Sequence, residues 1–225
     1  MTLRKTTSVT IALTTSLLAT AMLTSPLAAQ QANPSWNGFY AGLNAGGMWG
    51  TTSSPIGMNN TGGELDGAGS GFLGGAQAGY NYLMGPVLLG AEVDFQGSTY
   101  TANVNGSAGP STINAVEKMP WFSTMRMRAG YPVGSVMPYL TGGAVWGKRS
   151  IEGNVSDMGP FYADTNFWTW TVGGGIEGQV ADRWTLKLEY LYIGTPSVGL
   201  SAPATTSINE HSVGNVIRIG ANYRF

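Results

Sequence analysis

The sequence offers few residues for acid–base or nucleophilic chemistry. It contains one histidine and no cysteine among 225 residues, which excludes thiolate nucleophiles, thiolate metal sites and disulfides. His211 lies between Glu210 and Ser212, so a hydrolase with a serine, a histidine and an acid has to be considered. Adjacent residues on a strand point to opposite faces, however, which works against contact between His211 and Ser212. We expect no catalytic residue and, because no second ligand accompanies His211, no metal site.

A glycine-rich stretch and the overall charge bear on cofactors and nucleic acids. Gly173, Gly175 and Gly178 have the spacing G-x-G-x-x-G of dinucleotide-binding loops. They lie inside a strand-like pattern with no helix after it, so the structural context that this motif requires is missing. We therefore expect no cofactor. The formal net charge of −1 and the absence of a Lys/Arg run argue against a nucleic-acid partner.

The first 29 residues have the order of a secretory signal peptide. Arg4 and Lys5 come first, an apolar stretch covers residues 9–23, and small residues precede Gln30. The apolar stretch is shorter than the roughly 20 residues that a transmembrane helix needs. We expect residues 1–29 to be removed on export, leaving one mature domain, residues 30–225.

Eight later segments alternate between two unlike faces with a period of two, which indicates β-strands. Each has about ten residues, the length at which a tilted strand crosses a bilayer. One of them, 139–147, is apolar on both faces, and we expect Leu140, Ala144 and Trp146 to face outward. The eight segments are 39–49, 72–82, 87–96, 121–131, 139–147, 168–180, 184–192 and 217–225.

The aromatic residues decide between a soluble and a membrane-embedded barrel. If the segments run up and down from a periplasmic N-terminus, the outward aromatic residues fall into two belts with aliphatic residues between them. Amphipathic rings prefer the two membrane interfaces, and a soluble barrel has no reason to sort them in this way. The expected periplasmic belt contains Phe39, Tyr80, Tyr82, Tyr131, Trp184, Tyr223 and Phe225, and the external belt contains Trp49, Phe72, Phe95, Trp121, Trp146, Trp168, Trp170, Tyr190 and Tyr192.

The connections between segments also sort by length. Those at 83–86, 132–137 and 181–182 are short, whereas those at 51–69, 97–119, 148–166 and 194–213 are long and rich in Gly, Ser, Thr, Asn and Pro. Short periplasmic turns alternating with long external loops are typical of outer-membrane barrels. The sequence therefore predicts an all-β protein, an eight-stranded antiparallel up-and-down transmembrane β-barrel, following a cleaved signal peptide.

The face opposite the apolar one carries charged residues of both signs. An eight-stranded barrel is just wide enough for side chains to fill its interior, and a buried charge without a partner is costly. We expect a lumen charge network that plugs the barrel; a selectivity filter or proton path is the alternative. The expected members are Glu92, Asp94, Arg126, Arg128, Glu177, Lys187, Glu189, Arg218 and Arg224.

The C-terminus alternates outward apolar residues and ends in Tyr223 and Phe225, which resembles the signal read by the barrel assembly machinery of bacteria. With the stretches 36–42, 75–82, 126–131, 138–143 and 219–225, the chain resembles the small outer-membrane β-barrel proteins of alphaproteobacteria. This is the porin-like, immunogenic family related to the OmpA transmembrane domain and to OmpX.

The resemblance implies an abundant component of the outer membrane of a Gram-negative bacterium, with a role in envelope integrity and surface interaction. Its implied partners are outer-membrane lipid and lipopolysaccharide, the assembly machinery, and an extracellular ligand that binds the loops. A narrow porin-like channel for small solutes is the alternative function. An outer-membrane enzyme that modifies lipids, using His211, is the least favoured hypothesis.

Overall fold

The computed structural model describes residues 36–58, 61–108, 111–156, 159–194 and 211–225. The expected signal peptide, residues 1–29, lies outside the described residues. Within them, no helix has the length and apolar character needed to span a membrane.

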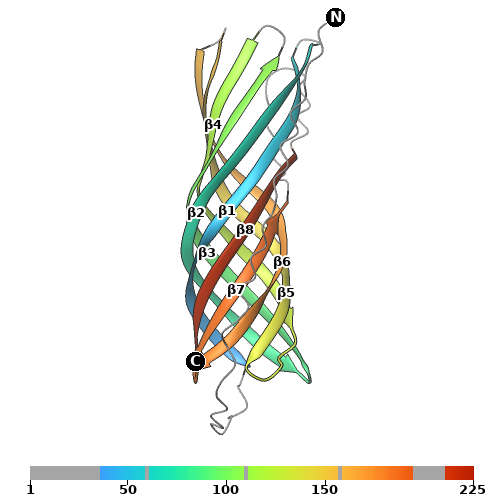
Figure 1. Ribbon diagram of the computed structural model, residues 1–225, viewed down its shortest axis with the longest axis vertical. Helices are drawn as coiled ribbons and strands as arrows, with labels where there is room; N and C mark the ends of the chain where they lie inside the picture. The colour runs from blue at the N-terminus through green and yellow to red at the C-terminus, as the bar shows by residue number, and fades with distance from the viewer. Residues whose placement is uncertain (1–35, 59–60, 109–110, 157–158, 195–210) are drawn as a thin grey trace, which may run out of the picture. The chain divides into compact units, whose positions relative to one another are not determined.

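The described residues form eight strands that pair in sequence order and close into a barrel (Figure 1). Every neighbouring pair is antiparallel, and β1 pairs with β8 to complete the ring. This confirms the predicted eight-stranded, up-and-down barrel. The strands are β1 (Gly38–Met58), β2 (Thr61–Met84), β3 (Val87–Ala108), β4 (Ser111–Gly130), β5 (Val136–Val155), β6 (Gly159–Ala181), β7 (Trp184–Ile193) and β8 (His211–Arg224).

The prediction of long loops at 51–69, 97–119 and 148–166 is wrong, because strands continue through most of these residues. Pairing between β1 and β2 reaches Met58↔Thr61, and pairing between β3 and β4 reaches Ala108↔Ser111. Pairing between β5 and β6 similarly reaches Val155↔Gly159. Gly, Ser, Thr and Asn raise the probability of a turn, but cross-strand hydrogen bonds persist as long as a partner strand lies opposite. Most of the fourth expected loop, residues 195–210, lies outside the described residues.

A bulge in β4 changes which residues face the interior. Between the pairs Lys118↔Ser150 and Trp121↔Lys148, two residues of β4 lie opposite one residue of β5. Pro120 is one of the two; proline cannot donate to a sheet and is accommodated at bulges. Consequently even-numbered residues such as Phe122 are buried on the C-terminal side of the bulge, and the odd-numbered Glu117 is buried on its N-terminal side.

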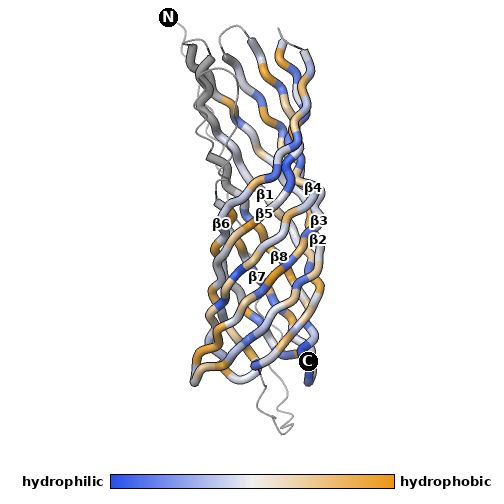
Figure 2. Tube along the Cα trace, turned by 180° about the vertical axis from the view of Figure 1, so that it is seen from behind, coloured by the Kyte–Doolittle hydropathy of each residue, from blue (hydrophilic) through white to orange (hydrophobic). Residues whose placement is uncertain are grey.

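The outer face of the barrel is apolar. Hydrophobic and hydrophilic residues alternate along the strands in Figure 2, as expected for a wall with lipid on one side and a polar lumen on the other. On β5, Leu140 is 73% exposed and Trp146 is 41% exposed, whereas Val145 is fully buried. The prediction that Leu140 and Trp146 face outward is therefore confirmed.

Aromatic rings gather at both ends of the apolar wall. At the end expected to face the periplasm, called the periplasmic end below, Trp184 contacts Tyr223, with ring centroids 5.3 Å apart, and Phe39 contacts Tyr80 at 4.6 Å. The opposite end is called the external end. At the external end four rings from neighbouring strands form a continuous row: Phe95–Trp121 at 5.7 Å, Trp121–Trp146 at 5.2 Å and Trp146–Trp168 at 5.8 Å. We call this row the external ring stack.

Inside the barrel, buried polar and charged side chains lie between two apolar clusters. The smaller cluster, at the periplasmic end, consists of Trp36, Leu88, Met137 and Tyr139. The larger cluster lies toward the external end and receives side chains from all eight strands. The polar layer between them contains the predicted site.

Candidate functional site: the charged lumen

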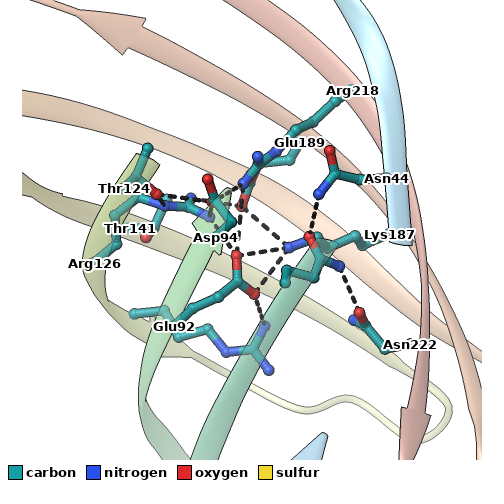
Figure 3. A network of polar contacts seen from close by, with 12 residues as sticks. Asn44, Glu92, Asp94, Thr124, Arg126, Thr141, Lys187, Glu189, Arg218 and Asn222 are labelled. Atoms are coloured by element: carbon teal, nitrogen blue, oxygen red, sulfur yellow. Dashed lines mark hydrogen bonds and ion pairs between the residues drawn. The ribbon is translucent and has the colours of Figure 1, made fainter. Parts of the chain in front are cut away.

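Five strands bring the nine predicted lumen residues into the interior, and all nine are buried. Period-two alternation explains this placement, because residues two apart on a strand share a face. Figure 3 shows several of these side chains pointing toward one another across the lumen. Glu92 and Asp94 come from β3, Arg126 and Arg128 from β4, Glu177 from β6, Lys187 and Glu189 from β7, and Arg218 and Arg224 from β8.

Glu92 joins three strands to its own. Lys187 Nζ lies 2.8 Å from Glu92 Oε1 and 2.9 Å from Oε2, so one ammonium group bridges both carboxylate oxygens. The guanidinium of Arg126 also donates to Oε1. The Tyr40 hydroxyl donates to Oε2 at 2.7 Å. These contacts hold the carboxylate from β7, β4 and β1 at once.

Glu189 makes an equally dense set of contacts from the opposite wall. Its Oε1 accepts hydrogen bonds from Arg126 NH1 at 3.0 Å and from the Tyr139 hydroxyl at 2.9 Å. Its Oε2 accepts one from Arg218 Nε at 2.7 Å. Charge-assisted hydrogen bonds of this kind are about twice as strong as neutral ones.

Asp94 completes a ring of carboxylates around Arg126. Asp94 Oδ2 lies 3.0 Å from Arg126 NH2 and 2.9 Å from Arg218 NH2. It also accepts a hydrogen bond from the Thr124 hydroxyl at 2.8 Å. Arg126 therefore contacts three carboxylates, and its planar guanidinium suits this because its five donors point in fixed directions.

Arg128 and Glu177 form a second pair closer to the periplasmic end. Arg128 NH1 lies 2.9 Å from Glu177 Oε2, and Arg128 Nε donates to Asn81 at 2.9 Å. The guanidinium also lies over two aromatic rings, 4.5 Å from the centroid of Tyr40 and 5.5 Å from that of Tyr139. Cation–π contacts strengthen when both groups are removed from water.

Arg224 lies beside the smaller apolar cluster. Its guanidinium is 5.2 Å from the centroid of the Trp36 ring, and NH2 donates to the Asp182 carbonyl oxygen at 3.3 Å. Without it, four carboxylates face four cationic groups, so the formal charge of the remaining group is zero. We call these eight residues the charge network: Glu92, Asp94, Arg126, Arg128, Glu177, Lys187, Glu189 and Arg218.

Sequence reasoning missed the neutral partners of the network. They face the lumen, as the charged residues do. The period-two alternation therefore predicts that they face inward, but a neutral side chain gives no sign that it bonds to a charged one. They include Tyr40, Asn81, Thr124, Tyr139, Thr185 and Asn222.

A second buried ion pair was also missed. Arg149 Nε lies 2.9 Å from Glu117 Oε1, and both residues are buried near the external end of the lumen. The sequence interpretation placed both in loops. Strand continuation and the β4 bulge bring them inside, and neither is evident from local composition.

The comparison with known proteins agrees with this geometry. A family model described as "Outer membrane protein beta-barrel domain" matches residues 15–225. The chain belongs to this family. It is an outer-membrane β-barrel protein of Gram-negative type, and its place is the outer membrane.

Named relatives of this outer-membrane barrel come from alphaproteobacteria, in keeping with the resemblance seen in its sequence. The 31 kDa outer-membrane immunogenic protein of Brucella melitensis biotype 1 is 36% identical over 211 residues, covering 89% of this chain and 88% of the relative. The 22 kDa outer membrane protein of Rhizobium leguminosarum bv. viciae is 32% identical over 158 residues, covering 70% of this chain and 64% of the relative.

Solved outer-membrane proteins are similar to this barrel at low sequence identity. Neisserial surface protein A (NspA) has a TM-score of 0.43 and 14% identity, covering 83% of this chain and 97% of that one. OprG of Pseudomonas aeruginosa has a TM-score of 0.47 and 12% identity, covering 84% and 97%.

The remaining chemical candidate, His211, lies at the start of β8, where its backbone is opposite Ser53. Glu210, which would have to orient the imidazole, lies outside the described residues. Among residues that the structure describes, no group of three or more His, Cys, Asp or Glu side chains is arranged to hold a metal ion.

Proposed function

We propose that this outer-membrane barrel has a structural role in the envelope and a surface-interaction role, with a lumen closed to solutes. The observation that carries the proposal is the charge network, in which eight buried groups of zero net formal charge bond to one another across the lumen. Buried ion pairs repay the cost of desolvation only when most of their hydrogen bonds are satisfied. A group arranged in this way favours a fixed plug.

A selectivity filter would use charged groups differently. It has to leave binding positions that an entering ion can occupy and leave again. Arg126 already contacts Glu92, Asp94 and Glu189, and Lys187 already bridges both oxygens of Glu92. An ion entering here would have to break these contacts, so the arrangement favours closure over conduction.

The surface-interaction role rests on the external ends of the strands. At the outer end of β6, Phe161 and Tyr162 point to opposite faces, yet both are exposed. Exposed aromatic residues are common anchors in protein recognition. The relatives named outer-membrane immunogenic proteins fit a molecule that presents such residues outside the cell. We propose that an external ligand binds these extended hairpins.

The lipid-facing wall and the C-terminus complete the proposal. We propose that lipid and lipopolysaccharide surround the apolar wall and that the assembly machinery recognises Tyr223 and Phe225. The Phe225 ring is 76% exposed and contacts Tyr223, with centroids 5.3 Å apart, so both rings are presented on the outside. We propose no enzymatic role; a His211→Ala variant is expected to leave lipid A composition unchanged.

Single-channel recording of the refolded protein in planar bilayers tests the closed lumen. We expect no steady conductance above that of the protein-free bilayer, because buried side chains fill the lumen. A reproducible stepwise conductance at the same protein density would instead establish the narrow channel and overturn the proposal.

A further inference from the structure

We infer that an apolar layer in the external half of the lumen, rather than the charge network, is the barrier to water and ions. The inference rests on the proposed closed lumen and assigns closure to particular residues. We call this layer the apolar septum: Met48, Leu73, Tyr100, Ala102, Phe122, Val145, Phe167, Leu191, Ile193 and Val216.

The septum is complete around the barrel. Each of the eight strands contributes at least one side chain, from Met48 on β1 to Val216 on β8. Phe122, Val145, Leu191 and Val216 have no solvent-exposed surface. Every strand therefore presents at least one apolar side chain to the lumen at this level.

Large and small residues interdigitate within the layer. A Cβ atom placed on Gly147 would lie 2.9 Å from Phe122 Cβ and 2.9 Å from two ring carbons of Phe167. A Cβ on Gly173 would lie 2.8 Å from a Leu191 methyl carbon. The missing Cβ atoms of these two glycines therefore leave room for Phe122, Phe167 and Leu191 to pack against the strand backbone, as in a close-packed protein core.

The septum lies directly next to the charge network. On β4, Phe122 is two residues from Thr124, which donates to Asp94. On β7, Leu191 follows Glu189 by two residues, and on β8 Val216 precedes Arg218 by two. On each of these three strands, a septum residue and a residue at the charge network are neighbours on the inward face, so the two layers are in direct contact.

The network by itself is a weaker barrier than its ion pairs suggest. Asp94 Oδ1 and Arg218 NH1 are buried and have no hydrogen-bond partner among the described residues. Such atoms favour bound water. The septum residues present hydrocarbon to the lumen. A hydrated ion passing them would lose its water ligands and gain no polar ligand in return. Narrow apolar constrictions also exclude water itself.

A small cavity of about 50 Å³ marks the external side of the septum, with Met48, Phe167 and Ile193 among its apolar lining and the Glu117–Arg149 ion pair on its wall. The Glu117–Arg149 ion pair therefore lies next to septum residues. We place the barrier at this level.

The absence of native cysteine allows a direct test. Gln96 is fully buried and lies opposite Phe122 in the β3–β4 register, at the boundary between septum and network. A Gln96→Cys thiol is treated from the external side with a membrane-impermeant, water-soluble maleimide, alongside conductance recording of the same variants. Thr101→Cys, at an exposed position, serves as the positive control for labelling.

Two septum variants are compared in this background. The first combines Phe122→Ala, Phe167→Ala and Leu191→Ala; the second is Leu191→Asn alone, which keeps the number and branching of the side-chain heavy atoms and supplies hydrogen-bonding groups. A combination of lipid-facing substitutions, Met125→Ala, Ile176→Ala and Leu188→Ala, is the matched control. The heat-dependent shift of the folded barrel on gel electrophoresis verifies folding of each variant.

Both septum variants are expected to raise the labelling rate of Gln96→Cys by at least about tenfold, since an apolar constriction loses its exclusion of water when widened or made polar. The lipid-facing control and Glu189→Gln are expected to leave it unchanged. If folded septum variants remain unlabelled and non-conducting, or if Glu189→Gln alone admits the label, the septum is not the barrier. Steady conductance of the wild-type protein would instead overturn the closed lumen itself.

Discussion

Loss of the Glu189 carboxylate should destabilise the charge network. Its carboxylate contacts Arg126, Arg218 and the Tyr139 hydroxyl. A Glu189→Gln variant leaves two buried guanidinium groups short of negative charge, so we expect the free energy of unfolding to fall by about 3–5 kcal/mol. Urea unfolding in lipid vesicles, followed by tryptophan fluorescence, measures this change.

Glu152 provides the matched control for Glu189. It forms an ion pair with Lys118 at 3.2 Å, but both side chains are about half exposed. Exposed pairs of this kind contribute about 0–1 kcal/mol, so Glu152→Gln should change stability little. If Glu189→Gln and Glu152→Gln lowered the free energy of unfolding equally, burial would not be what makes the ion pairs of the charge network stabilising.

Asp164, outside the membrane-spanning wall, should titrate at unusually low pH. Hydrogen bonds from Lys148 first, then from Tyr162 and Ser150, lower its pKa to about 2. The pKa of Asp164 is lower in the folded state than in the unfolded chain, where it is about 3.9. The ionised carboxylate therefore stabilises the fold above that pH, and this stabilisation is lost as the pH falls through about 2.

An NMR titration of the Asp164 carboxyl carbon measures this pKa. The wild-type midpoint should lie near 2, and Lys148→Ala should move it toward about 3.9, because the largest cause of the shift is removed. A wild-type midpoint already at the ordinary value would contradict the hydrogen-bonded geometry.

Among the elements, the external ring stack should stabilise the pairing of β3 to β6. Trp146 contacts both Trp121 and Trp168. Aromatic pairs contribute about 0.5–1.5 kcal/mol each beyond area burial, so Trp146→Leu should lower the free energy of unfolding by about 1–3 kcal/mol. Phe72→Leu, at a ring that is 78% exposed, is the control. A loss for Trp146→Leu no greater than for this control would argue against the stack.

The β4 bulge shows how one local irregularity redirects an element. Pro120 lies where the register with β5 shifts, and beyond it Glu117 turns inward to meet Arg149. Extending the period of two from Arg126 without interruption would turn Glu117 outward. Sequence periodicity predicts the strand, but the bulge has to be seen in the sheet before its side chains can be assigned.

For the whole molecule, the apolar wall should contact lipid rather than water. Leu43 and Leu188 are 69% and 52% exposed although both are aliphatic. Nitroxide labels at these positions in bilayers should be relaxed by dissolved oxygen and protected from a water-soluble nickel complex, because oxygen concentrates in hydrocarbon. Strong relaxation by the nickel complex at both positions would contradict insertion in this orientation.

Closure of the barrel follows from the same environment. An unpaired backbone group in hydrocarbon costs several kcal/mol, so the wall must have no open edge at membrane depth. The pairing of β1 with β8, from Tyr40↔Arg224 to Ser53↔His211, supplies the last set of backbone hydrogen bonds. The chain reaches this state although its two closing strands are far apart in sequence.

The sequence alone determined which residues face lipid and which face inward along the membrane-spanning part of each strand, because the side-chain period of a strand is two whatever its neighbours are. It also determined the aromatic belts, since rings such as Trp146 and Trp184 lie near the ends of their segments. These features are local, and local rules suffice to read them.

Only the tertiary structure decided which inward residues meet. Lys187 and Glu92 are 95 positions apart, and Arg218 and Asp94 are 124 apart. Their contact depends on strand register, on the bulge in β4 and on the ring being closed. The continuation of strands through glycine-rich segments and the gathering of septum residues from all eight strands have the same origin, because a partner strand supplies hydrogen bonds and packing that a single segment lacks.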